Sequence, residues 1–161
     1  MTADERRQKL AAYEEGPRLL AEAIQKFPRE MWQWKPAPDR WSIHEILVHM
    51  GDSETNAFLR ARRFLADPGL PVMSYDQDLW AQKLNYHAQN PDDAVTLITL
   101  VRRMTHAIVK DLPASAWAAV CEHGEYPSGT YTFDRWLDVY AKHIHGHIAQ
   151  MQKNYDAWKA R

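Results

Sequence analysis

Apolar residues along most of the chain recur at the three- and four-residue spacing of an amphipathic helix. Four long segments carry this pattern, and none keeps the strict alternation typical of a half-buried strand. Only nine prolines and six glycines interrupt the 161 residues. The pattern therefore predicts an all-α protein of four main helices, and the length predicts that residues 1–161 form a single domain.

Capping and breaking residues predict where these helices begin and end. The first covers about 2–26 and contains Gly16–Pro17, which we expect to kink or split it, because proline lacks an N–H. The second begins at the capping box Ser42–Glu45 and ends near residue 66. The third begins at Asn90–Pro91, an N-cap followed by proline, and stops before Pro113. The last covers about 132–159.

The connecting segments differ in character. Residues 27–41 hold three prolines and predict an extended, tryptophan-rich connector, and residues 76–86 predict a short helix. Residues 115–131 have little periodicity and predict a loop with a helical turn or a strand pair. Four helices of these lengths suit a four-helix bundle, which can house a site between facing helices.

Charge and composition exclude several classes of protein. Lys plus Arg is 20 and Asp plus Glu is 21, which disfavours a strongly basic nucleic-acid binder. We interpret the short basic runs at 60–63 and 102–103 as solvated helix faces. No apolar run suits a membrane span, and no apolar stretch after the N-terminus suits a secretory signal. The one cysteine, Cys121, excludes an intrachain disulfide framework and a four-cysteine zinc site; we expect an inert buried thiol and a cytoplasmic protein.

Two of the eight histidines stand together on the last predicted helix. His143 and His147 are four residues apart, about 40° around the helix, in the middle of its apolar side, whereas His145 points the opposite way. This spacing suits two ligands to one ion. A hydrogen-bonded pair of core histidines is the alternative, and two ligands are too few for a stable site.

The second predicted helix offers a third histidine. His44 and His49 form a motif that is one residue too long for the zinc-protease pattern and places them about 140° apart. His49 lies at the edge of the apolar arc and points inward, while His44 is expected to be a solvated first-turn residue. No helical spacing links the other three histidines to a further candidate ligand, so they are expected at the surface or in loops: His87, His106 and His123.

Two carboxylates accompany His49. Glu54 falls within the same apolar arc and has no cation three or four residues downstream, so we interpret it first as a carboxylate at the solvent edge. The alternative is a group that orients a ligand histidine, or a base. Asp52, three residues from His49, carries the same two interpretations.

Two ordered motifs and an upstream segment resemble the DinB/YfiT-like superfamily of small bacterial helical bundles. The motifs are Trp41-Ser42-Ile43 with Leu47-Val48-His49, Asp52 and Glu54, then His143-x-x-x-His147-x-x-Gln150; the segment is Lys35-Pro36-Ala37-Pro38. The resemblance implies an up-down-down-up four-helix bundle with a long connection at 67–90. It implies that His49, His143 and His147 hold a divalent metal ion, usually nickel or zinc, and that the protein is a homodimer.

The resemblance also implies a range of activities. Relatives include transferases that use a low-molecular-weight thiol such as bacillithiol or mycothiol, a thiol-dependent maleylpyruvate isomerase, and metal-dependent hydrolases. Three neutral histidines leave open positions on an ion, as in catalytic sites. From the resemblance we expect a thiol S-transferase-like enzyme acting on small electrophiles, and from charge and hydropathy we expect neither nucleic acid nor membrane as partner. The alternatives are a hydrolase at the same site and a non-catalytic metal- or ligand-binding protein, whose apolar pocket the seven tryptophans would suit.

Overall fold

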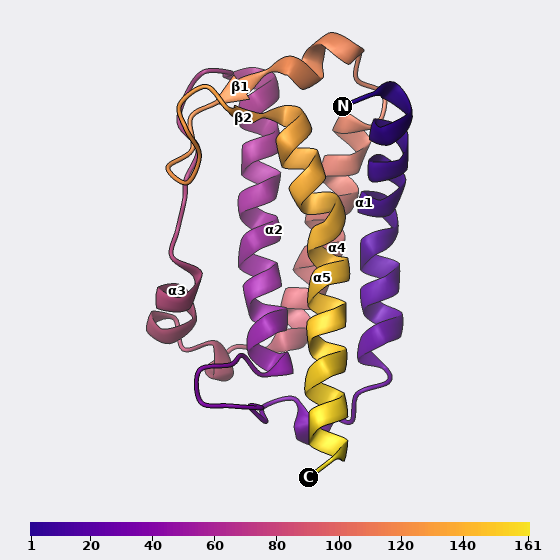
Figure 1. Cartoon of the computed structure of the whole chain (residues 1–161), viewed down its shortest axis with the longest axis vertical. Helices are drawn as coiled ribbons and strands as arrows, with labels where there is room; N and C mark the ends of the chain where they lie inside the picture. Colours follow the sequence, from indigo (N-terminus) through magenta and orange to yellow (C-terminus); the bar gives the residue numbers. More distant parts are fainter.

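The computed structural model describes residues 1–161 and consists of four long helices packed side by side (Figure 1). These helices are α1 (Ala3–Ile24), α2 (Ile43–Ala66), α4 (Pro91–Val109) and α5 (Phe133–Lys159). The connections hold a short helix, α3 (Gln77–Lys83), three 3-10 turns (Arg29–Met31, Tyr86–Ala88 and Ala114–Ala118) and two strands, β1 (Val120–Cys121) and β2 (Tyr131–Thr132). The prediction of an all-α fold with four main helices is confirmed.

The helices follow the up-down-down-up order. In Figure 1, α1 and α5 run downward and α2 and α4 run upward, with α2 packed mainly on α4 and α1 mainly on α5. Because α2 and α4 are parallel, residues 67–90 must return along the length of the bundle, and they carry α3 on the way (Figure 1). No helix combines the length and the apolar character that crossing a membrane requires.

The helices begin where the capping residues predict. The Ser42 hydroxyl accepts from the Glu45 N–H at 3.2 Å, and the Glu45 carboxylate accepts from the Ser42 N–H at 2.8 Å. Asn90 caps α4 and Thr132 caps α5 in the same way, each through its side-chain oxygen. These bonds satisfy N–H groups that have no partner within the helix.

Of the two alternatives for Gly16–Pro17, a kink or a split, the split is wrong, because α1 is continuous from Ala3 to Ile24. Pro17 has no N–H to donate to the carbonyl of Tyr13, one turn earlier. Arg102 of α4 donates to that oxygen instead, with an Nη1–O distance of 2.8 Å. A neighbouring helix thus supplies the hydrogen bond that α1 lacks.

Residues 115–131 contain both predicted alternatives, a 3-10 turn and a strand pair. β1 and β2 are antiparallel, with Val120 opposite Thr132 and Cys121 opposite Tyr131. A single bridge from Pro71 to Glu122 ties the long connection to this end of the bundle. Cys121 is fully buried, and burial raises the pKa of its thiol, as expected for an inert cysteine.

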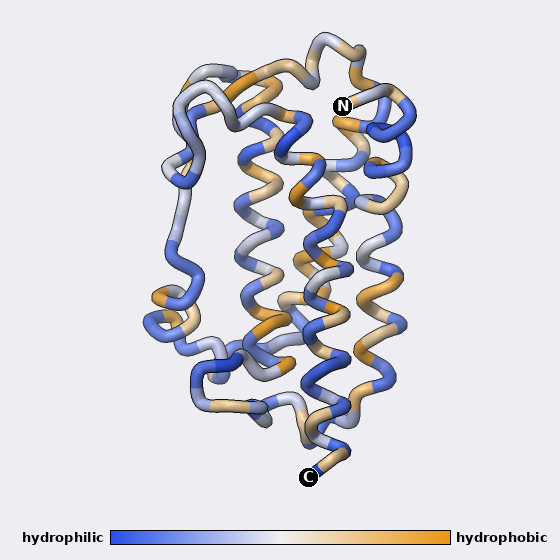
Figure 2. Tube along the Cα trace, in the orientation of Figure 1, coloured by the Kyte–Doolittle hydropathy of each residue, from blue (hydrophilic) through white to orange (hydrophobic).

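Apolar residues recur among polar ones along each long helix (Figure 2). The buried apolar side chains form two clusters. One cluster lies toward the strands and includes Trp136; the other lies toward the opposite end and includes Ile46. Charged Glu54 and Arg102 are buried at intermediate positions on α2 and α4. The core is therefore divided by a polar layer, and the inward histidines adjoin it.

Candidate metal-binding site

Three histidines converge inside the bundle, and they are the three that the resemblance implies as metal ligands. α2 supplies His49 and α5 supplies His143 and His147, and one ligand nitrogen from each lies within 4.8 Å of the others. The Nε2 atoms of His143 and His147 are 3.2 Å apart. His49 is buried, and its ring centroid lies 5.0 Å from that of His147.

Hydrogen bonds fix which nitrogen each α5 histidine presents. Nδ1 of His143 donates to Oε1 of Glu54 at 2.9 Å, and Nδ1 of His147 donates to Oε1 of Gln150 at 3.0 Å. In the tautomers in which Nδ1 is the donor, each ring presents an Nε2 lone pair, and the two Nε2 atoms face each other. Two nitrogens on one tetrahedral ion, each about 2.0–2.1 Å from it, are about 3.3 Å apart, close to the observed separation.

His49 completes the cluster with an unsatisfied nitrogen. Its Nδ1 is buried and has no hydrogen-bond partner, although nearly all buried polar atoms have one. The indole of Trp41 packs against the imidazole of His49 with ring centroids 4.6 Å apart. The His49 ring lies 5.0 Å from that of His147 and 5.7 Å from that of His143, centre to centre, so the three imidazoles form a donor set that suits a divalent metal ion.

The electrostatics favour the neutral forms of His49 and His147. Burial, together with the nearby His147 and His143, lowers the pKa of His49 to about 2. Burial and His143 lower the pKa of His147 to about 4, even though the bond to Gln150 acts in the opposite direction. Only neutral imidazole can ligate a metal, so at neutral pH both side chains are ready to do so.

The first interpretation of Glu54, a carboxylate at the solvent edge of α2, is wrong, because the residue is fully buried. Nε and Nη2 of Arg102 donate to its two oxygens at 2.9 and 2.7 Å. Burial alone would raise the pKa of Glu54, but the charge of Arg102 and the bonds from His143 and Arg102 hold it below its usual range. Glu54 is therefore a carboxylate that orients His143, the alternative interpretation of this residue.

The other candidate residues have partners elsewhere. Asp52 accepts a hydrogen bond from the Tyr86 hydroxyl at 2.6 Å. His44 is buried rather than solvated, because Gln89 lies over the start of α2 and its carbonyl bonds His44 Nε2 at 2.9 Å. His123, expected at the surface or in a loop, lies in the loop but is buried against Tyr131.

The remaining histidines lie nearer the surface. His145 is exposed, as predicted, while His87 and His106 are half-buried beside Glu45 and Glu14.

An opening at the surface of the bundle reaches His147, one of the three histidines. It has a volume of about 260 Å³ and is bounded by the connector before α2, by α3 and by α5. Its lining residues are mostly polar: Asp39, Arg40, Trp41, Gln77, Asp78, His147 and Gln150. The contribution of α3 could not be predicted from the sequence, because no local pattern places residues 77–78 beside residue 147.

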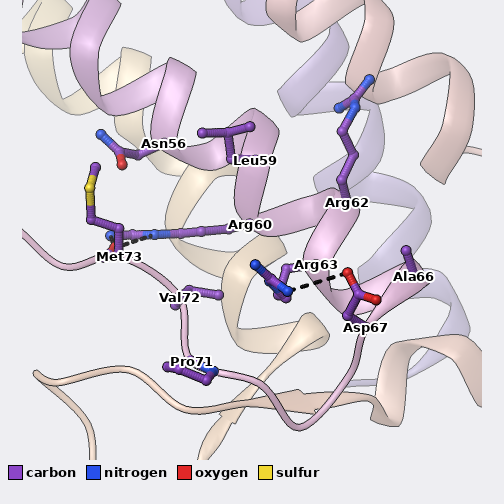
Figure 3. A pocket seen from close by; sticks show the side chains of 10 residues that line it. All are labelled: Asn56, Leu59, Arg60, Arg62, Arg63, Ala66, Asp67, Pro71, Val72 and Met73. Atoms are coloured by element: carbon purple, nitrogen blue, oxygen red, sulfur yellow. Dashed lines mark hydrogen bonds and ion pairs between the residues drawn. The ribbon is translucent and has the colours of Figure 1, made fainter.

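A second hollow, about 340 Å³ in volume, lies between the end of α2 and residues 71–73 (Figure 3). Arg60 donates from Nε to the carbonyl of Met73 at 3.1 Å, and Arg63 pairs with Asp67 at 3.3 Å. This hollow contains none of the histidines.

The interpretation of the basic runs as solvated faces is wrong for Arg102, which is buried, and right for Arg103, which is exposed.

Fold and site together define a four-helix bundle protein with an internal three-histidine cluster. The family model of the DinB superfamily matches residues 12–151, and the chain belongs to this superfamily.

Individual relatives agree with this assignment. "Putative metal-dependent hydrolase OB0782" of Oceanobacillus iheyensis is 22% identical over 86% of this chain and 78% of its own length. "Putative metal-dependent hydrolase YfiT" of Bacillus subtilis is 21% identical over 86% of this chain and 77% of its own length. The solved structure of YfiT, described as a probable metal-dependent hydrolase with an unusual four-helix bundle topology, has the same fold: the TM-score is 0.85 at 18% identity, over 96% of this chain and 87% of that one.

Proposed function

We propose that this protein is a metal-dependent enzyme in which His49, His143 and His147 hold a divalent ion, nickel or zinc. The observation that carries the proposal is the facing pair of Nε2 atoms, 3.2 Å apart, beside the orphaned Nδ1 of His49. The names of the relatives, metal-dependent hydrolases, support it. Three protein ligands leave coordination positions for a substrate, as in catalytic zinc sites.

We propose transfer of a low-molecular-weight thiol to a small electrophile as the reaction. A divalent ion at this site supplies Lewis acidity, which lowers the pKa of a thiol or of water. The thiol proton passes to solvent, sulfur forms a bond to the electrophilic carbon, and the leaving group departs with its electron pair. Thiol transfer needs no protein base, which agrees with the interior carboxylates: Glu54 is held by Arg102 and Asp52 by Tyr86.

Hydrolysis at the same site is the second candidate. The names of the relatives favour it, and two carboxylates, Asp39 and Asp78, line the opening beside His147. A hydrolase needs a base to take a proton from water, and these residues are the available ones. Replacing Asp39 or Asp78 with asparagine is therefore expected to impair hydrolysis and to leave thiol transfer unchanged.

Metal content tests the central proposal. The purified wild-type protein is expected to contain close to one divalent ion per chain, and His147→Ala much less. His145→Ala is the matched control, because His145 is exposed on the same helix and faces away from the cluster. A wild-type protein that binds neither nickel nor zinc, or a His145→Ala variant that loses as much metal as His147→Ala, would contradict the proposal.

Turnover by the metal-loaded protein separates the reactions. Thiol transfer predicts thiol-dependent consumption of a generic electrophile such as a chlorodinitrobenzene, abolished in His147→Ala. Ester or amide turnover without any thiol requirement would identify the hydrolase. Metal binding with neither activity would favour a non-catalytic binding protein.

A further inference from the structure

Arg102 contacts every other long helix of the bundle. From α4 it donates to Glu54 of α2 through Nε and Nη2, to the Tyr13 carbonyl of α1 through Nη1, and to the Tyr140 carbonyl of α5 through Nη2 at 2.7 Å. Its side chain is 1% exposed, and its guanidinium also lies 4.2 Å from the centre of the Tyr13 ring. The geometry of the guanidinium is therefore fixed by four acceptors on three helices.

Gly16–Pro17 forms a seat for this guanidinium in α1. A proline at 17 leaves the Tyr13 carbonyl without its helical donor, and Arg102 occupies that acceptor. A Cβ at position 16 would lie 2.7 Å from Arg102 Nη1 and 3.0 Å from Ile144 Cδ1, so only glycine leaves the space. Both residues are unfavourable in the middle of a helix, and one bound guanidinium accounts for both.

The arginine is linked to the histidine cluster through a single oxygen. Oε1 of Glu54 accepts from Arg102 Nη2 at 2.7 Å and from His143 Nδ1 at 2.9 Å. Because Arg102 holds both carboxylate oxygens, Glu54 cannot rotate away from His143. The bond to Nδ1 in turn selects the tautomer of His143 whose Nε2 lone pair faces the cluster.

We propose that Arg102, seated on Gly16–Pro17, is the positioning residue of the metal site. It acts through Glu54 to hold His143 in its ligating tautomer and orientation. This inference rests on the proposed function for its metal-binding consequence. Its structural part, control of the His143 tautomer, holds for the metal-free protein as well.

Two measurements on the full-length protein test the proposal. Nitrogen-15 NMR of the metal-free protein reports the tautomer of His143, and competition titration with Ni²⁺ or Zn²⁺ reports affinity. Arg102→Met is expected to bind metal at least tenfold more weakly, the usual effect of removing a group that orients a ligand, and to show a mixture of tautomers at His143. Arg103→Met, at the exposed neighbouring position, is the matched control and is expected to match the wild type in both readouts.

Variants at the seat test it without touching the cluster. Pro17→Ala restores a helical N–H that competes for the Tyr13 carbonyl, so metal affinity is expected to fall severalfold.

If Arg102→Met does not fold, Arg102→Lys replaces it. Lysine keeps the charge but loses the two-pronged contact with Glu54, so metal affinity is again expected to fall. The role of Arg102 would be overturned if its folded variants kept the wild-type tautomer of His143 and a metal affinity within twofold of wild type. The role of the seat would be overturned if Pro17→Ala left the metal affinity unchanged. A wild-type protein that binds no metal would refute the proposed function, while the tautomer measurement would still decide this inference.

Discussion

The metal-free protein should lose stability as the pH falls from 7 to 5, and His147 should account for a defined share of that loss. An unfolded chain gives this histidine a pKa near 6.5, whereas the folded protein lowers it to about 4. Below about pH 6.5 the unfolded state therefore binds a proton that the folded state does not, so the free energy of unfolding falls with pH. The loss continues down to about pH 4, below which both states are protonated.

The pKa values set the size of the effect. Each pKa unit corresponds to about 1.4 kcal/mol, and between pH 7 and pH 5 the difference between the two states amounts to about 2 kcal/mol for His147 alone. His49, whose folded pKa is about 2, adds a loss of similar size over the same interval. Against a total stability of about 5–15 kcal/mol, such losses are readily measured.

Urea unfolding of chelator-treated protein at pH 7 and pH 5 is the assay. His147→Gln removes one of the two groups, so its stability should fall by about 2 kcal/mol less than that of the wild type. His145→Gln is the control, because His145 is exposed on the same helix, and it should show the full wild-type loss. If His147→Gln keeps the wild-type pH dependence, the buried neutral imidazole is not the cause and the reasoning fails.

Three further changes test the packing around the site. Ser42→Ala removes the cap of α2 and should lower the free energy of unfolding by about 1 kcal/mol in urea; no loss would mean that the capping bonds contribute nothing net. Gly146→Ala meets no atom within 4 Å on a helical face and should raise the stability by about 0.5–1 kcal/mol with metal content unchanged; a loss of metal would reveal a role for the glycine itself. Arg102→Met should cost about 3–5 kcal/mol by leaving Glu54 charged and buried, and adding Glu54→Gln should restore part of that; a double variant no more stable than the single one would refute the charge-burial explanation.

The features that could be predicted from the sequence are local ones. The caps at Ser42, Asn90 and Thr132 act within three residues of themselves, so the helix starts could be predicted without knowledge of the packing. The inward direction of His143 and His147 follows from helix geometry in the same way. Helix geometry also gives the inward direction of His49, but that it lies at the level of the other two was implied only by the resemblance to the DinB/YfiT-like superfamily.

The errors concern partners on other segments. The cation for Glu54 is not three or four residues along its own helix but 48 residues away, on α4. A helical wheel of α2 cannot show this, and it cannot show that Gln89 covers His44. Arg102 and Arg103 differ for a related reason: adjacent residues on a helix point about 100° apart, so one faces the core and the other faces solvent.

The long connection between the parallel helices α2 and α4 carries α3, which borders the opening beside His147 but holds none of the three histidines. The histidines belong to the long helices of the bundle, whereas much of the opening is lined by residues 39–41 of the connector before α2 and by residues 77–78 at the start of α3. Surface segments of this kind accept substitutions and insertions at little cost to the fold. Changes at the exposed positions 39–40 and 77–78 would therefore alter the lining of the opening without altering the packing of the four long helices. The lining of the opening can thus vary while the interior that positions the histidines stays the same.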